Sequence, residues 1–304
     1  MADTAKPRMA VIGLGSMGFG MATSLRRKGY EVTGCDVAAD AVARFVKDGG
    51  KGAATPAEAA KGADIVISVV LNAAQTETIL FGKNGVSDTL AKGAVLVSSA
   101  TMDPDVARRL AKQLEPTGRH YLDAPISGGA QRAAQGELTI LASGSAAAFA
   151  KARPALDAMA AKLYELGEEP GQGAAFKMVN QLLAGVHIVA ASEAMAFAAR
   201  QGLDLRKVYE VITASAGNSW MFENRMKQVL EGDYKPRSAV EIFVKDLGIV
   251  QDMARNARFP APVAAAALQM FLAAAGSGMG RDDDASVARL YARISGTKIP
   301  GEPK

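Results

Sequence analysis

The run MAVIGLGSMG, residues 9–18, constrains the fold more than any other feature of the chain. An apolar stretch typical of a β-strand leads into three glycines with the spacing G-x-G-x-x-G, and a helical pattern follows. In this context the glycines allow a tight turn and close approach of the backbone to a dinucleotide pyrophosphate. A glycine-rich turn without a ligand is the alternative, and the position between strand and helix favours the cofactor site. The predicted cofactor loop comprises Gly13, Leu14, Gly15, Ser16, Met17 and Gly18.

Asp36 stands at the end of the second predicted strand, eighteen residues after Gly18. A carboxylate at this position can accept hydrogen bonds from both hydroxyls of the adenosine ribose, and it would repel a 2′-phosphate. No arginine follows directly, since residues 37–39 are Val, Ala and Ala. The combination predicts NAD rather than NADP as the cofactor, and capping of the strand end is the alternative role for Asp36.

Short β-rich runs alternate with helical patterns over the first half of the chain, which is typical of a mostly parallel sheet with crossover helices. The predicted strands are residues 9–15, 31–36, 64–70, 94–100, 119–125 and 137–144. After Gly171 and Gly173 the strand patterns stop, and helices are predicted at about 174–200, 204–215, 221–231, 239–256, 262–275 and 284–294. The sequence thus predicts an α/β, doubly wound Rossmann domain that binds NAD at residues 1–169. An all-helical domain for substrate binding and oligomerisation is predicted at residues 170–304.

The composition is that of a globular protein and argues against several functions. The 35 basic and 31 acidic residues are interspersed, without the basic stripe and interleaved aromatics that nucleic-acid binding requires. A single cysteine, Cys35, and two distant histidines offer neither a disulfide nor a zinc site, so we expect no metal. The N-terminus lacks the apolar core of a signal peptide, which predicts a cytoplasmic location.

Two apolar stretches bear on membranes and partners. Residues 182–199 approach the length of a membrane span, but His187 and Glu193 interrupt them, which favours a buried helix. Residues 262–278 are apolar enough to bury a face against another subunit, although packing within the chain explains them nearly as well. We expect a homodimer or homotetramer that contacts no membrane.

Three later segments place polar groups where chemistry could occur. Residues 123–130 put a serine and two glycines after a strand, where backbone N–H groups could hold an anion. Residues 176–181 place a lysine and two amides on one helix face, and residues 242–248 put Lys-Asp in an apolar helix. Each alone is more typical of a turn or a solvated surface, but together, behind a nucleotide-binding domain, they favour a site. The residues concerned are Ser127, Gly128, Gly129, Lys177, Asn180, Gln181, Lys245 and Asp246.

The stretches GLGSMG, DAPISGG, GQGAAFKMVNQ and VKDLG, in this order, make the chain resemble the β-hydroxyacid dehydrogenases. That family includes 3-hydroxyisobutyrate dehydrogenase and tartronate semialdehyde (glyoxylate) reductase, and the resemblance covers nearly the whole chain. Residues 71–77, 180–196, 215–225 and 232–248 are most similar to the L-threonate dehydrogenase branch, which oxidises a four-carbon aldonate at C2 with NAD. The two other activities are the alternatives, and a catalytically inactive dinucleotide-binding scaffold is a hypothesis of a different class.

The resemblance also implies a role for individual residues. Lys177 would be the catalytic acid/base, and the loop at Ser127 would hold the substrate carboxylate. The implied substrate-binding residues are Ser127, Gly128, Gly129, Asn180, Gln181 and Asp246, and the remaining implied cofactor contacts are Leu71, Asn72, Thr101 and Lys245. The chain departs from many members of the family at Gln181, where they have a second asparagine. A further departure, the small residues at 238–240, would leave room for a longer, hydroxylated substrate.

Proton transfer by a lysine needs help from its surroundings, because a lysine in water is almost wholly protonated at neutral pH. Burial and the positive charge of the oxidised nicotinamide would both favour the neutral amine. The bound substrate carboxylate would favour the ammonium.

Overall fold

The computed structural model describes residues 6–301 of the chain. The chain divides into two compact units, Met1–Lys177 and Met178–Lys304, which we call the α/β unit and the helical unit. This division falls inside helix α8 (Gln172–Arg200), whereas the boundary expected from the sequence, 169/170, precedes that helix.

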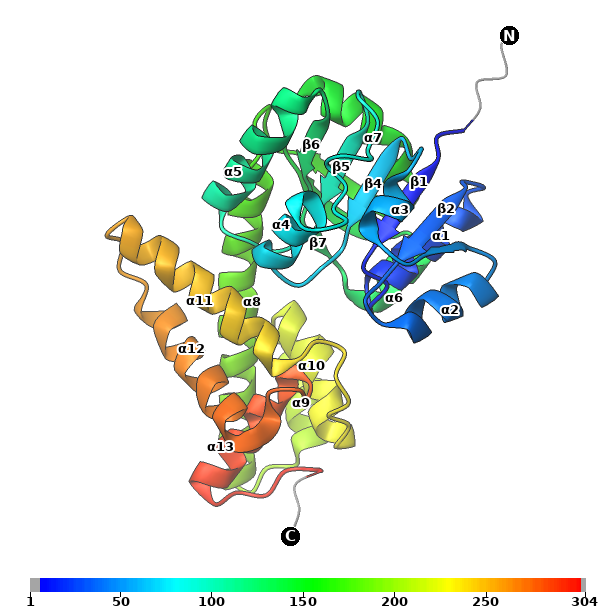
Figure 1. Ribbon diagram of the computed structural model, residues 1–304. Helices are drawn as coiled ribbons and strands as arrows, with labels where there is room; N and C mark the ends of the chain where they lie inside the picture. Colours follow the sequence, from blue (N-terminus) through cyan, green and yellow to red (C-terminus); the bar gives the residue numbers. More distant parts are fainter. Residues whose placement is uncertain (1–5, 302–304) are drawn as a thin grey trace. The chain divides into compact units, whose positions relative to one another are not determined.

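Six parallel strands form the main sheet of the α/β unit, in the order β3-β2-β1-β4-β5-β6 (Figure 1). They are β1 (Met9–Ile12), β2 (Val32–Cys35), β3 (Lys51–Ala53), β4 (Ile65–Ser68), β5 (Val95–Ser98) and β6 (His120–Asp123). The strand order reverses between β1 and β4, and ligands of such sheets bind outside the carboxyl ends of the strands at that point. The predicted Rossmann sheet is therefore confirmed, with the glycine loop directly after β1. Its edge strand β3 is not among the predicted strands, and the predicted strand at 137–144 lies in a second sheet.

The helices of the α/β unit follow the strands in sequence. They are α1 (Gly18–Arg27), α2 (Ala39–Lys47), α3 (Pro56–Ala60), α4 (Ala73–Phe81), α5 (Pro104–Leu114), the 3₁₀ turn η1 (Glu115–Thr117), α6 (Gly129–Gln135) and α7 (Ala146–Met159). Several begin at side-chain caps that the sequence supplies. Asn72, for example, accepts a hydrogen bond from the N–H of Gln75 and so starts α4 at the end of the β4 segment.

A second, three-stranded sheet lies beside β6. Strand β8 (Leu138–Ala142) pairs antiparallel with β7 (Ile126–Ser127) and parallel with β9 (Ala160–Glu165). Asp123 and Ser143 exchange backbone hydrogen bonds of 3.0 and 2.8 Å, which join the edge of the main sheet to the end of β8. The sequence predicted β8 but missed β9, because its segment, AAKLYE, contains no β-branched residue.

The helical unit continues from α8 through helices close to those predicted (Figure 1). They are α9 (Leu205–Thr213), α10 (Trp220–Glu231), α11 (Val240–Asn256), α12 (Pro262–Ala274), the π turn η2 (Ala275–Met279), the 3₁₀ turn η3 (Asp284–Ser286) and α13 (Val287–Ser295). The acidic run before α13 ties this unit together: Asp282 pairs with Arg289 at 2.8 Å, and the buried Asp284 with Arg225 at 2.6 Å.

Residues 238–240 pack inside the helical unit. The N–H of Ser238 donates to the Asp283 carboxylate at 3.4 Å, and Ala239 forms a backbone bridge with the same residue. Val240 is fully buried in the core of the unit. These residues are therefore anchored within the helical unit, and the room they would leave for a longer substrate stays a prediction.

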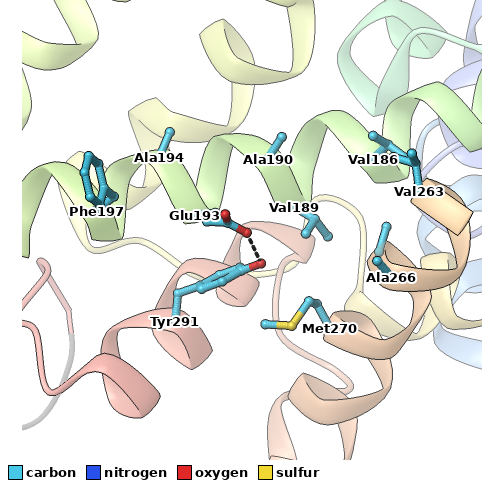
Figure 2. A pocket seen from close by; sticks show the side chains of 11 residues that line it. Val186, Val189, Ala190, Glu193, Ala194, Phe197, Val263, Ala266, Met270 and Tyr291 are labelled. Carbon is cyan, nitrogen blue, oxygen red and sulfur yellow. Dashed lines mark hydrogen bonds between the residues drawn. The ribbon is translucent and has the colours of Figure 1, made fainter.

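An open apolar groove of about 530 Å³ runs between α8, α12 and α13 (Figure 2). In the groove, the Tyr291 hydroxyl donates a hydrogen bond of 2.6 Å to the Glu193 carboxylate. Burial and the charge of that carboxylate raise the pKa of Tyr291. By length and composition alone, α8 and the helix Pro262–Met279 could each cross a membrane. Half of the apolar window of α8 is buried inside the protein, as in the core helix of a globular unit.

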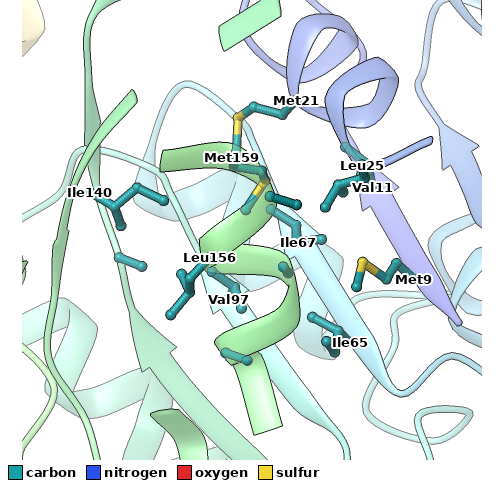
Figure 3. Close-up of a cluster of buried hydrophobic side chains, with 14 of the residues drawn as sticks. Met9, Val11, Met21, Leu25, Ile65, Ile67, Val97, Ile140, Leu156 and Met159 are labelled. Atoms are coloured by element: carbon teal, nitrogen blue, oxygen red, sulfur yellow. The ribbon is translucent and has the colours of Figure 1, made fainter. Parts of the chain in front are cut away.

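The main sheet is buried on both faces, which is why its strands read as nearly continuous apolar runs. Figure 3 shows the cluster on one face, where strand residues such as Val11, Ile67 and Val97 meet α1 and α7. Their neighbours along each strand point to the opposite face and join a second cluster. These two cores fix the ends of the strands, and those ends carry the polar residues described next.

Candidate active site

The glycines of the loop after β1 have different reasons to be glycine. Gly13 has a φ of +99°, and a Cβ there would overlap the carbonyl oxygen of Val69; a Cβ on Gly18 would overlap the carbonyl oxygen of Gly13. Gly15 has neither constraint, because its φ lies outside the left-handed region and no protein atom lies within 4 Å of the Cβ position. The open space beside Gly15 fits a pyrophosphate approaching the backbone.

Helix α1 begins without help from the described side chains. Its N-cap residue, Met17, makes no capping hydrogen bond, and the first turn contains no acidic residue. The N–H groups and the positive end of the helix dipole are therefore available to an anion. Ser16 is exposed at this end, whereas Leu14 points into the core.

Asp36 connects the end of β2 to the glycine loop. Its Oδ2 accepts the N–H of Leu14 at 2.6 Å, and its Oδ1 accepts the N–H of Ala38 at 2.8 Å. These bonds hold the carboxylate rigidly while each oxygen keeps a further lone pair, so the residue fits two ribose hydroxyls. Val37, beside it, is fully exposed.

The predicted residues after β4 and β5 lie at the same edge of the sheet as the glycine loop, since all these strands are parallel. Leu71 is an exposed apolar side chain, and its N–H donates to Gln75. Asn72 uses its Oδ1 as the cap of α4. Thr101, after β5, is half-buried.

The start of α8 is clamped onto the ends of β6 and β8. Oδ2 of the buried Asp123 accepts the N–H groups of Gly171 and Ala174 at 2.9 and 2.8 Å. The hydroxyl of Ser143 accepts the N–H of Gly173 at 2.9 Å. Burial raises the pKa of Asp123 to about 6, although these hydrogen bonds pull in the opposite direction. A Cβ on Gly173 would overlap the carbonyl oxygen of Leu141, so this glycine serves the docking of the helix.

Asp123 and Ser143, which hold the start of α8, are not among the residues predicted from the sequence. The available signal was an acidic residue ending an apolar strand, HYLD, just before a motif already singled out. Such residues at strand ends in parallel sheets commonly face the site.

Lys177 lies one turn after this clamp and is buried, with 7% of its surface exposed. Its Nζ donates to the carbonyl oxygen of Ile126 at 2.9 Å. Ser127 follows Ile126 at the end of β7, and Gly128 and Gly129 continue into α6 with φ values of +137° and +77°. The structure thus brings the predicted proton-transfer group to the strand that carries the predicted carboxylate loop.

The predicted polar residues of the helical unit form a chain from α8 to α11. Asn180 Nδ2 donates to Gln181 Oε1 at 2.9 Å, and Gln181 Nε2 donates to Asp246 Oδ2 at 2.5 Å. The other oxygen of Asp246 is paired with the ammonium of Lys245. Gln181 and Asp246 are buried, whereas Asn180 is exposed. Within residues 6–301, no cluster of three or more His, Cys, Asp or Glu side chains could hold a metal.

Comparison with known proteins identifies the family of the chain. Residues 8–167 match the family described as the NAD binding domain of 6-phosphogluconate dehydrogenase, and residues 171–291 match the NAD-binding domain of NADP-dependent 3-hydroxyisobutyrate dehydrogenase. The protein belongs to the β-hydroxyacid dehydrogenase family. It is therefore an NAD-dependent hydroxyacid dehydrogenase.

Among relatives of this dehydrogenase, the L-threonate dehydrogenase of Cupriavidus necator is 50% identical over 97% of this chain and 98% of that protein. The L-threonate dehydrogenase of Escherichia coli is 46% identical over 96% of both proteins. A solved structure of 3-hydroxyisobutyrate dehydrogenase from Salmonella typhimurium has a TM-score of 0.90 and 47% identity, over 94% of this chain and 100% of that one.

Proposed function

We propose that this dehydrogenase oxidises the C2 hydroxyl of a four-carbon sugar acid, converting L-threonate to 2-oxo-tetronate with NAD. The observation that carries the proposal is the 50% identity to an L-threonate dehydrogenase over 97% of the chain. The buried Lys177 beside the Ser127 loop supports it, because an aldonate needs both an anion site and a group that takes its hydroxyl proton.

In the proposed mechanism, Lys177 accepts the proton of the C2 hydroxyl as hydride leaves C2. Bound NAD would supply the hydride acceptor, and the products would be the 2-oxo acid, NADH and one proton. The Ile126 carbonyl accepts an N–H from Lys177 both before and after proton transfer, so it keeps Nζ in place. The reaction requires the neutral amine, and Lys177 lies buried against the Ile126 carbonyl.

The remaining roles follow from the chemistry of each group. The Ser127 hydroxyl and the N–H groups of Gly128 and Gly129 would hold the carboxylate, which needs donors. Asn180 would contact a substrate hydroxyl, and Lys245 would contact the cofactor. Ion pairing with Asp246 holds the Lys245 stem in one place.

The test is a substrate panel followed through the appearance of NADH at equal enzyme concentration. We expect the highest kcat/KM with L-threonate and lower values with D-threonate, D-glycerate and 3-hydroxyisobutyrate. The second candidate is oxidation of 3-hydroxyisobutyrate, favoured by the name of the Salmonella structure. A higher kcat/KM on that acid than on L-threonate would overturn the first proposal, and turnover of none of the acids would overturn both candidates.

A further inference from the structure

The chain of amides between α8 and α11 has a defined direction. An Asp246 carboxylate paired with the Lys245 ammonium only accepts hydrogen bonds, so the atom of Gln181 that faces it must be the amide nitrogen. The Gln181 oxygen then faces Asn180, which must in turn present its own nitrogen. Amide orientations are normally assigned from such networks, and here one buried carboxylate fixes both.

This orientation determines which atom Asn180, the exposed member of the series, presents to solvent. Once Asn180 Nδ2 faces Gln181, the Oδ1 atom points to the other side of the amide plane. Within the described part of the chain this oxygen accepts no hydrogen bond, and the side chain is exposed. An exposed, oriented acceptor recognises a donor, and among the groups of a small acid the donors are its hydroxyls.

We propose that Gln181 is a positioning residue that fixes the Asn180 amide with its oxygen outward, as the acceptor for a hydroxyl group of a polyhydroxylated acid. The proposal rests on the proposed function for the identity of the reaction, and it adds the residue that selects for hydroxyls beyond C2. Gln181 is buried and uses both amide atoms in these bonds, its nitrogen towards Asp246 and its oxygen towards Asn180, whereas Asn180 is exposed.

The length of the side chain matters. The two bonds of 2.9 and 2.5 Å place the Gln181 amide between a residue of its own helix and one on α11. An asparagine is shorter by one methylene and would lose at least one of these bonds. Its loss would leave the Oδ2 atom of Asp246 without its donor or release Asn180 to rotate, and a buried polar atom without a partner is costly.

The first experiment needs no substrate. A neutron structure of the protein distinguishes N–D from C=O directly. We expect deuterium on the Gln181 atom that faces Asp246 and on the Asn180 atom that faces Gln181. Deuterium on the outward-facing atom of Asn180 would overturn the proposal, whatever acid the enzyme proves to oxidise.

The second experiment measures selectivity with Gln181→Met, which keeps the volume and removes both hydrogen bonds, with Asn180→Ala, and with the double variant. The readout is the ratio of kcat/KM for the polyhydroxylated acid that the enzyme turns over best to that for the 2-hydroxy acid of equal length without the other hydroxyls. We expect each single variant to lower the ratio roughly tenfold, the size of one neutral hydrogen bond. The double variant should lower it no further, because both changes remove one contact.

Two controls separate this role from general damage. NADH binding, followed by fluorescence, should be retained in the single variants. Gln251→Met, which removes a side-chain bond to the Ala261 carbonyl elsewhere on α11, should leave the ratio unchanged. An unchanged ratio in Gln181→Met, or effects that multiply in the double variant, would overturn the proposal, since the latter means that Gln181 contacts the substrate independently.

Discussion

The Nζ of Lys177 donates a hydrogen bond of 2.9 Å to the carbonyl oxygen of Ile126. The same short segment carries the Asp123 carboxylate, which holds the first N–H groups of α8, and the Ser127 hydroxyl. One segment of five residues therefore sets the helix that carries the lysine, the lysine itself and the predicted carboxylate loop. Precise placement of this kind is what proton transfer requires.

Replacement of Lys177 should abolish turnover without unfolding the protein. We expect Lys177→Ala to lower kcat by roughly a hundred- to ten-thousand-fold, the usual contribution of a general acid/base. Lys177→Met fills more of the same space and should be equally inactive, which separates loss of the amine from loss of packing. Circular dichroism and NADH fluorescence should resemble those of the wild type. Near-normal kcat in either variant would rule out the proposed proton transfer.

The glycines of the cofactor loop should respond differently to alanine. Gly15→Ala should leave the melting temperature of the cofactor-free protein unchanged, because its Cβ meets no protein atom, and should raise KM for NAD. Gly13→Ala should lower the melting temperature itself, because it combines a positive φ with overlap on Val69. Thermal unfolding and steady-state kinetics distinguish the two. An unchanged KM in Gly15→Ala would argue that no pyrophosphate approaches this position.

Asp36→Ala should raise KM for NAD far more than it changes the use of NADP. The substitution removes the acceptor for the ribose hydroxyls and, with it, the charge that opposes a 2′-phosphate. Because Asp36 also holds the N–H of Leu14, Asp36→Asn is the matched control: one oxygen remains for that bond. We expect Asn to give an intermediate KM for NAD. Equal losses with both cofactors in Asp36→Ala would mean that the residue supports only the loop.

Much of this fold was predictable because its strands are short, apolar on both faces and separated by helices, as in GLGSMG and the segments after it. The features that the sequence did not predict, strand β9 and the role of Asp123, depend on contacts between distant segments of the chain. Strand β9 forms against β8 despite a weak local preference, since tertiary pairing overrides propensity. The sequence could not show which groups Asp123 bonds to, because Gly171 and Ala174 lie about fifty residues away and only the folded backbone brings them together.

The polar residues on α8 show a similar limit. Helical periodicity placed Lys177 and Gln181 on one face, and the structure keeps both buried. Periodicity does not, however, identify the residues to which these side chains form hydrogen bonds. Gln181 is predicted to touch substrate by analogy with an asparagine. In the structure its amide atoms bond to Asn180 and Asp246, and the substrate contact stays a prediction.

The predicted homo-oligomer should depend on the groove between α8 and α12. Phe197 lines it and is 66% exposed, and a charge there would oppose burial against a second copy of the chain. We expect the wild type to be a dimer or tetramer by light scattering after size exclusion, and Phe197→Asp to shift it towards the monomer. Val211→Asp, at an exposed valine on α9, should leave the mass unchanged. A monomeric wild type would contradict the prediction.

Asp123 should make stability fall as pH rises through the weakly acidic range. Burial raises its pKa to about 6 in the folded protein, above the unfolded value of 3.8. The stabilising contribution is therefore fully present below about pH 4, where both states are protonated, and is lost as pH approaches and passes 6. A difference of this size corresponds to about 3 kcal/mol. Asp284 has a pKa raised to about 6 by its burial as well and acts in the same direction.

Asp123→Asn isolates this effect, because asparagine cannot titrate and its oxygen can still accept the N–H groups of Gly171 and Ala174. We expect the free energy of unfolding, measured in urea between pH 4 and 7, to fall less steeply in the variant than in the wild type. The Asp284 contribution remains in both proteins and cancels in the comparison. Parallel pH profiles would show that Asp123 does not change its proton affinity on folding, and that its carboxylate is fully compensated by the start of α8.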